Sequence, residues 1–129
     1  MLSGATVHTT LPASDLERAR RFYEGALGLV PARVAPAGVF YRGGGGTRFL
    51  VFPSAGQASG SHTQMGFSVT DIEAAVADLR ARGVTFESYD FPGFDTATGI
   101  ATFPGNRSAW FKDTEGNLLG IVQIDDPLD

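Results

Sequence analysis

Apolar residues follow two spacings along this chain, strand-like alternation and helical stripes, and the same succession occurs twice. Val7, Thr9 and Leu11 alternate with polar positions, as in a half-buried strand. A stripe with spacings of three and four residues follows and stops at a glycine, as helices often do. The pattern predicts strands over 5–11 and 63–69 and helices over 14–28 and 70–83.

Each predicted helix is followed by short apolar segments that predict further strands. In the first half they cover 30–34, 39–42 and 47–52, and in the second half 84–90, 108–112 and 117–123. The Gly43–Gly46 run joins two of these strands, so a hairpin turn is expected there and not a phosphate-binding loop.

The two halves correspond position by position. Ser14 with Glu17 and Thr70 with Glu73 match the capping box, which predicts where each helix begins. Helix positions differ by 56 residues (15 to 71), and late strand positions differ by 70 (40 to 110). The second half therefore contains about 14 additional residues, which fall within 91–106.

Segment 91–106 is rich in apolar side chains for a loop of that length: Phe91, Phe94, Ile100 and Phe103. Loops this long are uncommon in compact domains and are often lids or binding loops. Two interpretations stay open: the segment covers the protein's own core, or it caps a ligand cavity.

Composition narrows the function classes. The chain has no cysteine, which excludes disulfides, thiolate metal sites and a cysteine nucleophile. Its net charge of −4 argues against nucleic acid as a partner. No apolar run is long enough to span a membrane, and no secretory signal is recognisable, so a cytoplasmic location is expected.

Three motifs carry a family resemblance: H-T-T-L-P-A-S-D over 8–15, F-Y-x-x-x-L-G-L over 22–29 and W-F-K-D-T-E-G-N-L over 110–118. Together with the duplication, they resemble the vicinal oxygen chelate superfamily of glyoxalase I, bleomycin-resistance proteins and extradiol dioxygenases. The resemblance implies one α+β domain over 1–129. It would consist of two βαβββ units, each a cupped mixed sheet backed by a helix, around a half-barrel cavity. The expected bounds are 4–54 for the first unit, 55–61 for a linker, 62–124 for the second unit and 125–129 for a tail.

In metal-dependent members of that family, His and Glu side chains at four positions hold a divalent ion. By the resemblance, these positions fall here on His8, Leu50, Gln64 and Gly120. Leucine and glycine offer no ligand atom, and one imidazole with one amide is a poor set for Zn, Ni, Fe or Mn. No cofactor is therefore expected, and a divalent metal held by altered ligands is the alternative.

The expected ligand cavity contains the same four residues together with aromatic rings: His8, Gln64, Leu50, Gly120, Trp110, Phe40 and Phe94. Trp110 and Phe111 correspond to Phe40 and Tyr41, and alternation does not say which member of each pair faces the cavity.

The favoured function is metal-free binding of a small organic molecule. The alternatives are a metal-dependent lyase, isomerase or dioxygenase, a metal-free enzyme with His8 as catalytic base, and an interaction module. The resemblance also implies a homodimer.

Overall fold

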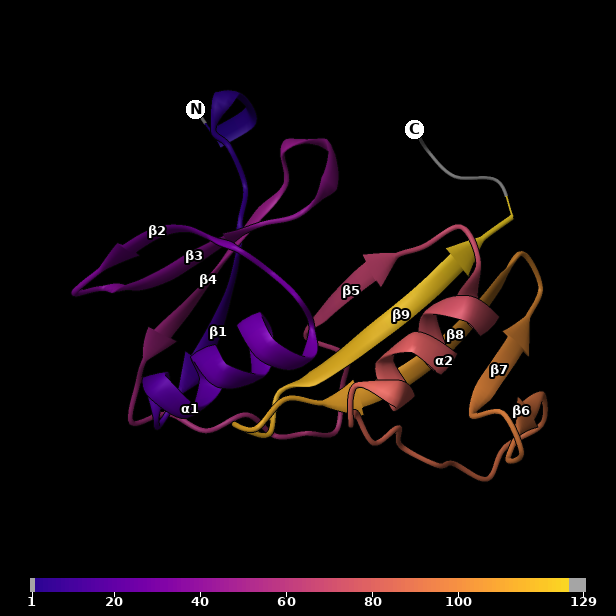
Figure 1. Ribbon diagram of the computed structural model, residues 1–129. Coiled ribbons are helices and arrows are strands. Elements are labelled where there is room, and N and C mark those ends of the chain that lie inside the picture. The colour runs from indigo at the N-terminus through magenta and orange to yellow at the C-terminus, as the bar shows by residue number, and fades with distance from the viewer. Residues whose placement is uncertain (1, 126–129) are drawn as a thin grey trace. The chain divides into compact units, whose positions relative to one another are not determined.

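The computed structural model describes residues 2–125, and the chain divides into two compact units, Met1–Gln57 and Ala58–Asp129 (Figure 1). The division falls within the segment expected as a linker. Of the expected tail, residues 126–129 lie outside the described residues. Unit 1 contains η1 (Leu2–Gly4), β1 (Thr9–Ala13), α1 (Leu16–Arg20), η2 (Arg21–Ala26), β2 (Pro31–Ala35), β3 (Gly38–Arg42), η3 (Gly44–Gly46) and β4 (Arg48–Pro53). Unit 2 contains β5 (Met65–Ser68), α2 (Ile72–Ala81), β6 (Phe94–Asp95), β7 (Ile100–Phe103), β8 (Asn106–Lys112) and β9 (Leu118–Ile124).

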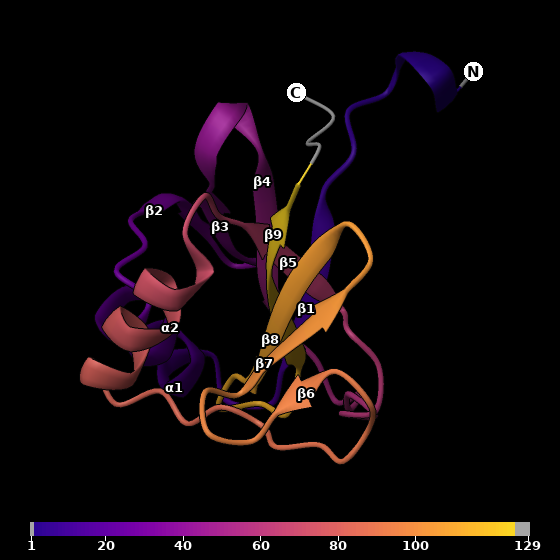
Figure 2. The same ribbon diagram turned by 90° about the vertical axis from the view of Figure 1, so that its right-hand side faces the viewer.

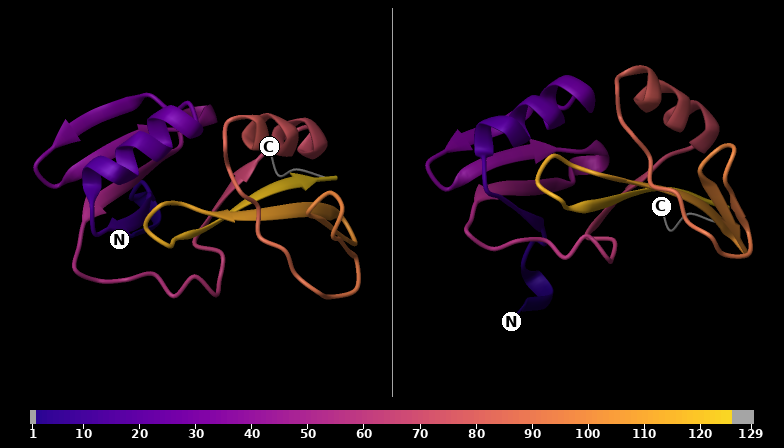
Figure 3. Two further views of the ribbon diagram at one scale, coloured as in Figure 1. Left: turned by 60° about the horizontal axis from the view of Figure 1, so that its bottom comes forward. Right: turned by 90° about the horizontal axis from the view of Figure 1, so that it is seen from below.

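Each unit is a mixed sheet with its helix on one face (Figure 3). In unit 1 the strand order is β1-β4-β3-β2, and in unit 2 it is β5-β9-β8-β7-β6. The first strand of each unit is parallel to the last, and the other neighbours are antiparallel. Neither sheet closes into a barrel. The predicted α+β class and duplicated units are confirmed.

The core of unit 1 lies between its sheet and the helical segment α1–η2. Tyr23 of η2 packs against Tyr41 and Phe49, with ring centroids 5.6 Å away in both cases. Leu11 and Val51 belong to the same face and are fully buried. We call the opposite face, away from the helix, the distal face of each sheet.

The helices begin one residue later than the capping boxes predicted. Asp15 and Asp71 are the N-caps, and their carboxylates accept hydrogen bonds from the backbone N–H groups of Arg18 and Ala74 at 3.1 Å. A charged carboxylate also interacts favourably with the positive end of the helix dipole. The expected Ser14 and Thr70 caps are therefore wrong by one position.

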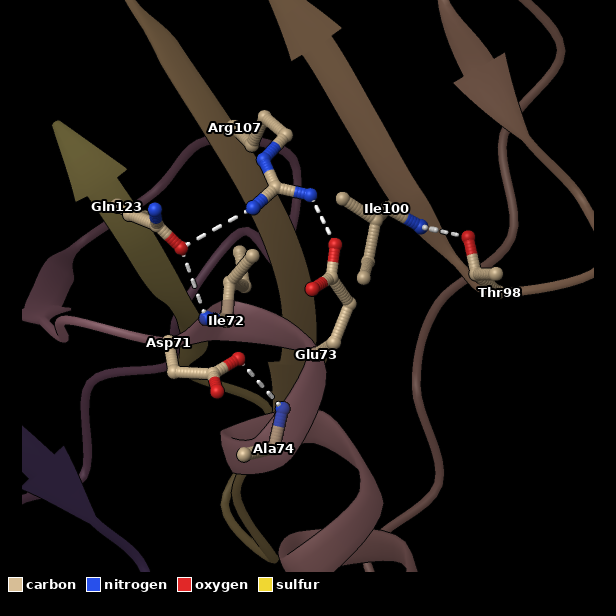
Figure 4. Close-up of polar contacts among 8 residues, drawn as sticks. All are labelled: Asp71, Ile72, Glu73, Ala74, Thr98, Ile100, Arg107 and Gln123. Atoms are coloured by element: carbon tan, nitrogen blue, oxygen red, sulfur yellow. Dashed lines mark hydrogen bonds and ion pairs between the residues drawn. The ribbon is translucent and has the colours of Figure 1, made fainter. Parts of the chain in front are cut away.

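Contacts from the sheet fix the start of α2 (Figure 4). The Gln123 side-chain oxygen accepts from the Ile72 N–H at 3.0 Å and from Arg107 at 3.2 Å, while Arg107 also pairs with Glu73. Residues 107 and 123 therefore lie on the helix face of unit 2. By alternation, Phe111 shares that face and is fully buried, and Trp110 lies on the distal face.

Three predicted segments differ in the structure. Segment 84–90, expected as a strand, makes only an isolated bridge between Phe86 and Phe111. Segment 91–106, expected as a loop, contains β6 and β7, and β7 pairs with residues 106–108 of β8 (Figure 2). Since β7 occupies the first half of that edge, segment 84–90 can bond only to the second half. The first strand also begins at Thr9 and not at residue 5, and Val7 is 92% exposed.

Among residues 2–125, no helix has the length and apolar character needed to cross a bilayer.

Candidate functional site

The pairing of first and last strands places equivalent residues of the two units on the distal faces. Thr10 pairs with Leu50 in unit 1, and Gly66 pairs with Gly120 in unit 2. These pairs are related by the same offsets of 56 and 70 residues that the sequence shows. The register thus agrees with the placement of Leu50 and Gly120 at equivalent positions.

In unit 1 the distal face carries a row of apolar side chains beside an exposed imidazole. Thr10, Leu50 and Phe40 lie opposite one another on three neighbouring strands, and Leu50 and Phe40 are half-buried. His8 precedes β1, and its ring lies edge-on to Phe40 with centroids 5.7 Å apart. Of the neighbouring pair Phe40 and Tyr41, Phe40 therefore lies on this face and Tyr41 is fully buried on the other.

Gln64 is engaged in a hydrogen-bond network that closes the β8–β9 hairpin. Its Nε2 donates to Asn117 Oδ1 at 3.0 Å, and its Oε1 accepts from the Leu118 N–H at 3.2 Å. Asn117 is fully buried and donates through Nδ2 to Asp113 Oδ2 at 2.7 Å. Asp113 Oδ1 also accepts from the N–H groups of Glu115 and Asn117. The side chain of Gln64 thus connects the start of β5 to this turn.

Gly120 lies beside the indole of Trp110 on the distal face of unit 2. The two residues are cross-strand partners, and Trp110 Nε1 donates to Thr63 Oγ1 at 3.0 Å. A Cβ added at Gly120 would lie 3.3 Å from Thr63 Cγ2 and 3.5 Å from the indole. Gly66 pairs with Gly120 on the other side and is exposed, whereas Gly120 itself is buried. The indole and Thr63 thus border the space where a larger side chain at this position would lie.

Trp110 also belongs to an aromatic cluster. It consists of Tyr89, Phe91, Phe94, Phe103 and Trp110. Phe91 and Phe103 stack with centroids 5.9 Å apart, and Tyr89 meets Trp110 edge-on at 5.6 Å. Four members are half-buried, and Phe103 is 37% exposed. Burial raises the pKa of Tyr89, with a smaller contribution from Glu87.

The predicted site residues are thus distributed over two surfaces. Of them, Trp110, Phe94 and Gly120 belong to the unit 2 surface, and His8, Phe40 and Leu50 belong to the unit 1 surface. Sequence reasoning did not select Tyr89, Phe91 or Phe103 as site residues. The apolar content of segment 91–106 was the available signal, and that segment contributes both to the cluster and, through Ile100 and Ala101, to the core.

The four family metal positions do not fit a divalent ion. Leu50 and Gly120 lack donor atoms, the amide oxygen of Gln64 already accepts a hydrogen bond, and His8 is a single imidazole. Within residues 2–125, no group of three or more His, Cys, Asp or Glu side chains is arranged to hold a metal ion.

A separate polar network lies on the helix side of unit 1. Glu24 Oε2 accepts from Arg20 Nε at 2.8 Å and from the Tyr41 hydroxyl at 2.9 Å. The Arg20 hydrogen bond lowers the pKa of Glu24, whereas burial, followed by the Glu24 contact, raises the pKa of Tyr41. These groups satisfy one another, and Arg20 and Glu24 border an open depression of about 400 Å³. We assign this network to the stability of the fold.

Comparison with solved structures shows the same fold. TnmS3, an antibiotic binding protein from Streptomyces sp. CB03234, is 25% identical with a TM-score of 0.67, over 93% of this chain and 98% of that chain. A glyoxalase/bleomycin resistance protein/dioxygenase from Alicyclobacillus acidocaldarius is 22% identical with a TM-score of 0.70, over 95% and 93%. The fosfomycin resistance protein FosX from Listeria monocytogenes is 15% identical with a TM-score of 0.70, over 97% and 93%.

No protein with a curated description matches this sequence significantly. The family model for the Glyoxalase/Bleomycin resistance protein/Dioxygenase superfamily matches residues 5–121, which is most of the chain. The resemblance carried by the three sequence motifs is thereby confirmed: the chain belongs to the glyoxalase/bleomycin resistance protein/dioxygenase superfamily.

Proposed function

We propose that this protein binds a small, planar organic molecule against the distal face of unit 2, without the metal of its catalytic relatives. The aromatic cluster, whose Trp110 lies beside Gly120, is the observation that carries this proposal. The exposed Gly66 adds no side chain to this face, and the rings of the cluster offer faces and edges on which a planar ligand can stack. A surface of many apolar and few polar groups is typical of small-molecule sites.

Polar groups at this surface are few and could orient a ligand. Thr63 Oγ1 already accepts the Trp110 N–H, and its own hydroxyl hydrogen remains available to a ligand acceptor. The half-buried phenol of Tyr89 is a second hydrogen-bonding group. A phenol is protonated at neutral pH and can therefore donate, and the raised pKa of Tyr89 extends this state to higher pH.

The related structures support the ligand class. TnmS3 is described as an antibiotic binding protein and FosX as a fosfomycin resistance protein. Two of the four family metal positions, Leu50 and Gly120, offer no ligand atom. This supports binding without a metal over a metal-dependent lyase, isomerase or dioxygenase activity. We further propose, from the family resemblance, that the protein is a cytoplasmic homodimer. Light scattering and cell fractionation would test these two points.

A metal-free reaction with His8 as catalytic base is the second candidate. The exposed ring next to Phe40 favours it, because a ligand lying on Phe40 would contact the imidazole. Among the described residues no hydrogen-bond partner orients the His8 ring, and such a partner is what usually fixes the tautomer of a catalytic histidine. We therefore rank metal-free binding above this second candidate.

Fluorescence tests the binding proposal directly, because Trp110 is the single tryptophan of the chain. A panel of planar aromatic compounds should contain members that quench its emission saturably and raise the melting temperature. Phe103→Ala should weaken such a ligand about fivefold, which corresponds to about 1 kcal/mol of stacking. Val30→Ala, an exposed position in unit 1, is the matched truncation and should leave the affinity unchanged.

Two results would contradict this proposal. One is a panel in which no compound changes both signals, which would favour an interaction module. The other is stoichiometric Zn, Ni, Fe or Mn in the purified protein that is lost in His8→Ala, since this would restore the metal-dependent alternative. The second candidate would be supported if the metal-free wild type turned over a substrate and the His8→Ala variant did not.

A further inference from the structure

Three arginines lie on the distal face of unit 1, next to its apolar row. Arg42 and Arg48 are direct cross-strand partners on β3 and β4, and Arg33 on β2 lies opposite Phe40. Direct partners in an antiparallel pair project to the same side of a sheet. Phe40 is in turn opposite Leu50, so the register places the three guanidinium groups and the apolar row on one face.

A bulge decides the position of Arg33. Pro31 pairs with Tyr41, whereas Arg33 pairs with Phe40, so the register shifts between Pro31 and Arg33. Without this shift, two residues that are two positions apart would share a face. Because of the shift, Pro31 lies on the same face as the buried Tyr41, whereas Arg33 lies on the distal face. Bulges re-orient side chains in this way.

Within residues 2–125, no carboxylate forms an ion pair with these three arginines. The acidic residues of residues 1–57 are Asp15, Glu17 and Glu24, and all three lie on the cap and helical segment that covers the other face. The guanidinium groups of Arg33, Arg42 and Arg48 are exposed and make no ion pair or hydrogen bond with another described residue.

The charge asymmetry of the chain follows the same division. Residues 1–57 carry six arginines against three acidic residues, hence a net charge of +3. Residues 58–129 carry four basic and eleven acidic residues, hence −7, which together give the −4 of the whole chain. The cationic face is therefore a local feature of unit 1 that the overall composition conceals.

Like charges directly opposite each other on a sheet oppose folding, and an oxyanion between them removes that repulsion. The planar guanidinium fork binds carboxylate and phosphate oxygens through paired N–H groups. We infer that the distal face of unit 1 is an oxyanion site. Arg42 and Arg48 hold a phosphate, phosphonate or carboxylate group, Arg33 adds a third donor, and Phe40 and Leu50 contact the apolar part of the same molecule.

This inference is independent of the aromatic site in unit 2, because the two surfaces share no residue. The apolar row beside the arginines gives it a specific consequence. An oxyanion that carries a hydrophobic group should bind more tightly than an inorganic ion of the same charge. We therefore choose phenylphosphonate, benzoate and inorganic phosphate as probes, at constant ionic strength with chloride as the background anion, since salt screens such sites.

Calorimetric titration of the full chain should give saturable binding, with phenylphosphonate tighter than inorganic phosphate. Comparison of benzoate with phenylphosphonate distinguishes a carboxylate from a phosphonate ligand. In the double variant Arg42→Gln, Arg48→Gln, affinity should fall at least tenfold. The control Arg21→Gln, Arg82→Gln removes the same charge from exposed positions outside this face and should change affinity less than twofold. The variant Arg42→Lys, Arg48→Lys keeps both positive charges but lacks the planar guanidinium groups. Its affinity for phenylphosphonate should lie between that of the wild type and that of the double glutamine variant.

Equal losses in the two glutamine variants would overturn the inference, since they would show an effect of net charge alone. Absence of saturable binding by the wild type would also overturn it, as would an oligonucleotide that binds more tightly than phenylphosphonate. Binding of a neutral aromatic ligand should quench Trp110 fluorescence to the same extent in the wild type and in both glutamine variants. If this ligand does not quench the fluorescence of the wild type, that result contradicts the proposed function and does not bear on the oxyanion site.

Discussion

The hydrogen bonds of Gln64 lead to a prediction that separates a structural role from a ligand role. Replacing Gln64 by alanine removes its bonds to Asn117 and Leu118, at 3.0 and 3.2 Å. Each neutral hydrogen bond contributes about 0.5–1.5 kcal/mol net, so the loss of both should lower the free energy of unfolding by about 1–3 kcal/mol.

Asn117→Ala should be more costly, because it removes a bond to a nearly buried carboxylate as well as the bond to Gln64. The Asn117 Nδ2 lies 2.7 Å from Asp113 Oδ2, and Asp113 is only 6% exposed. Hydrogen bonds to charged groups contribute about 1.5–3 kcal/mol, which gives an expected total of about 3 kcal/mol. For a domain of this size the melting temperature should fall by about 10 °C.

Urea denaturation of wild type, both single variants and the double variant measures the pairwise energy. The double variant should be more stable than the sum of the single losses predicts, by about 0.5–1.5 kcal/mol, because the two residues share one bond. Gln57→Ala, at an exposed position outside the network, is the matched control. The reasoning fails if Gln64→Ala unfolds with the wild-type free energy. It also fails if that variant abolishes ligand binding with unchanged stability, which would make Gln64 a ligand-binding residue.

Three further predictions concern other parts of the fold. Arg48→Gln should raise the free energy of unfolding by about 0.2–1 kcal/mol in urea titrations at low salt, since it removes the repulsion with Arg42; a destabilised variant would contradict this. The wild type should lose stability above about pH 10, where unfolded tyrosine ionises, because the raised pKa of Tyr41 keeps the folded phenol neutral. Tyr41→Phe, measured by urea denaturation between pH 8 and 11, should lose less stability at high pH than the wild type. At pH 8 the variant should be about 1 kcal/mol less stable, because it lacks the hydrogen bond to Glu24. Equal pH profiles of the two proteins would refute the assignment. Gly120→Leu should cost about 1–3 kcal/mol and shift the tryptophan emission by crowding the neighbouring indole; an unchanged spectrum would contradict that geometry.

Local patterns in the sequence predicted most elements. Alternation and helical stripes depend on neighbours close in sequence, so they located the two helices and most of the strands. The caps at Asp15 and Asp71 were displaced by one residue, because serine, threonine and aspartate are all good caps and only the backbone conformation selects one. Segment 84–90 alternates like a strand, yet half of the β8 edge that it would need is occupied by β7.

The sequence by itself determined the duplicated α+β architecture, since this follows from residue types and their spacing, and its three motifs indicated the family. The assignment of the family's metal positions to His8, Leu50, Gln64 and Gly120 stays a prediction from that resemblance. Only the tertiary structure decided that Phe40 and Trp110 lie on the distal faces and that five rings from 89–110 form one cluster. It also decided that the Gln64 side chain forms hydrogen bonds to the β8–β9 hairpin. It also brought three separated arginines to one face through strand register and a bulge. The physical reason is that register and burial depend on which strands become neighbours, and no local pattern contains that information.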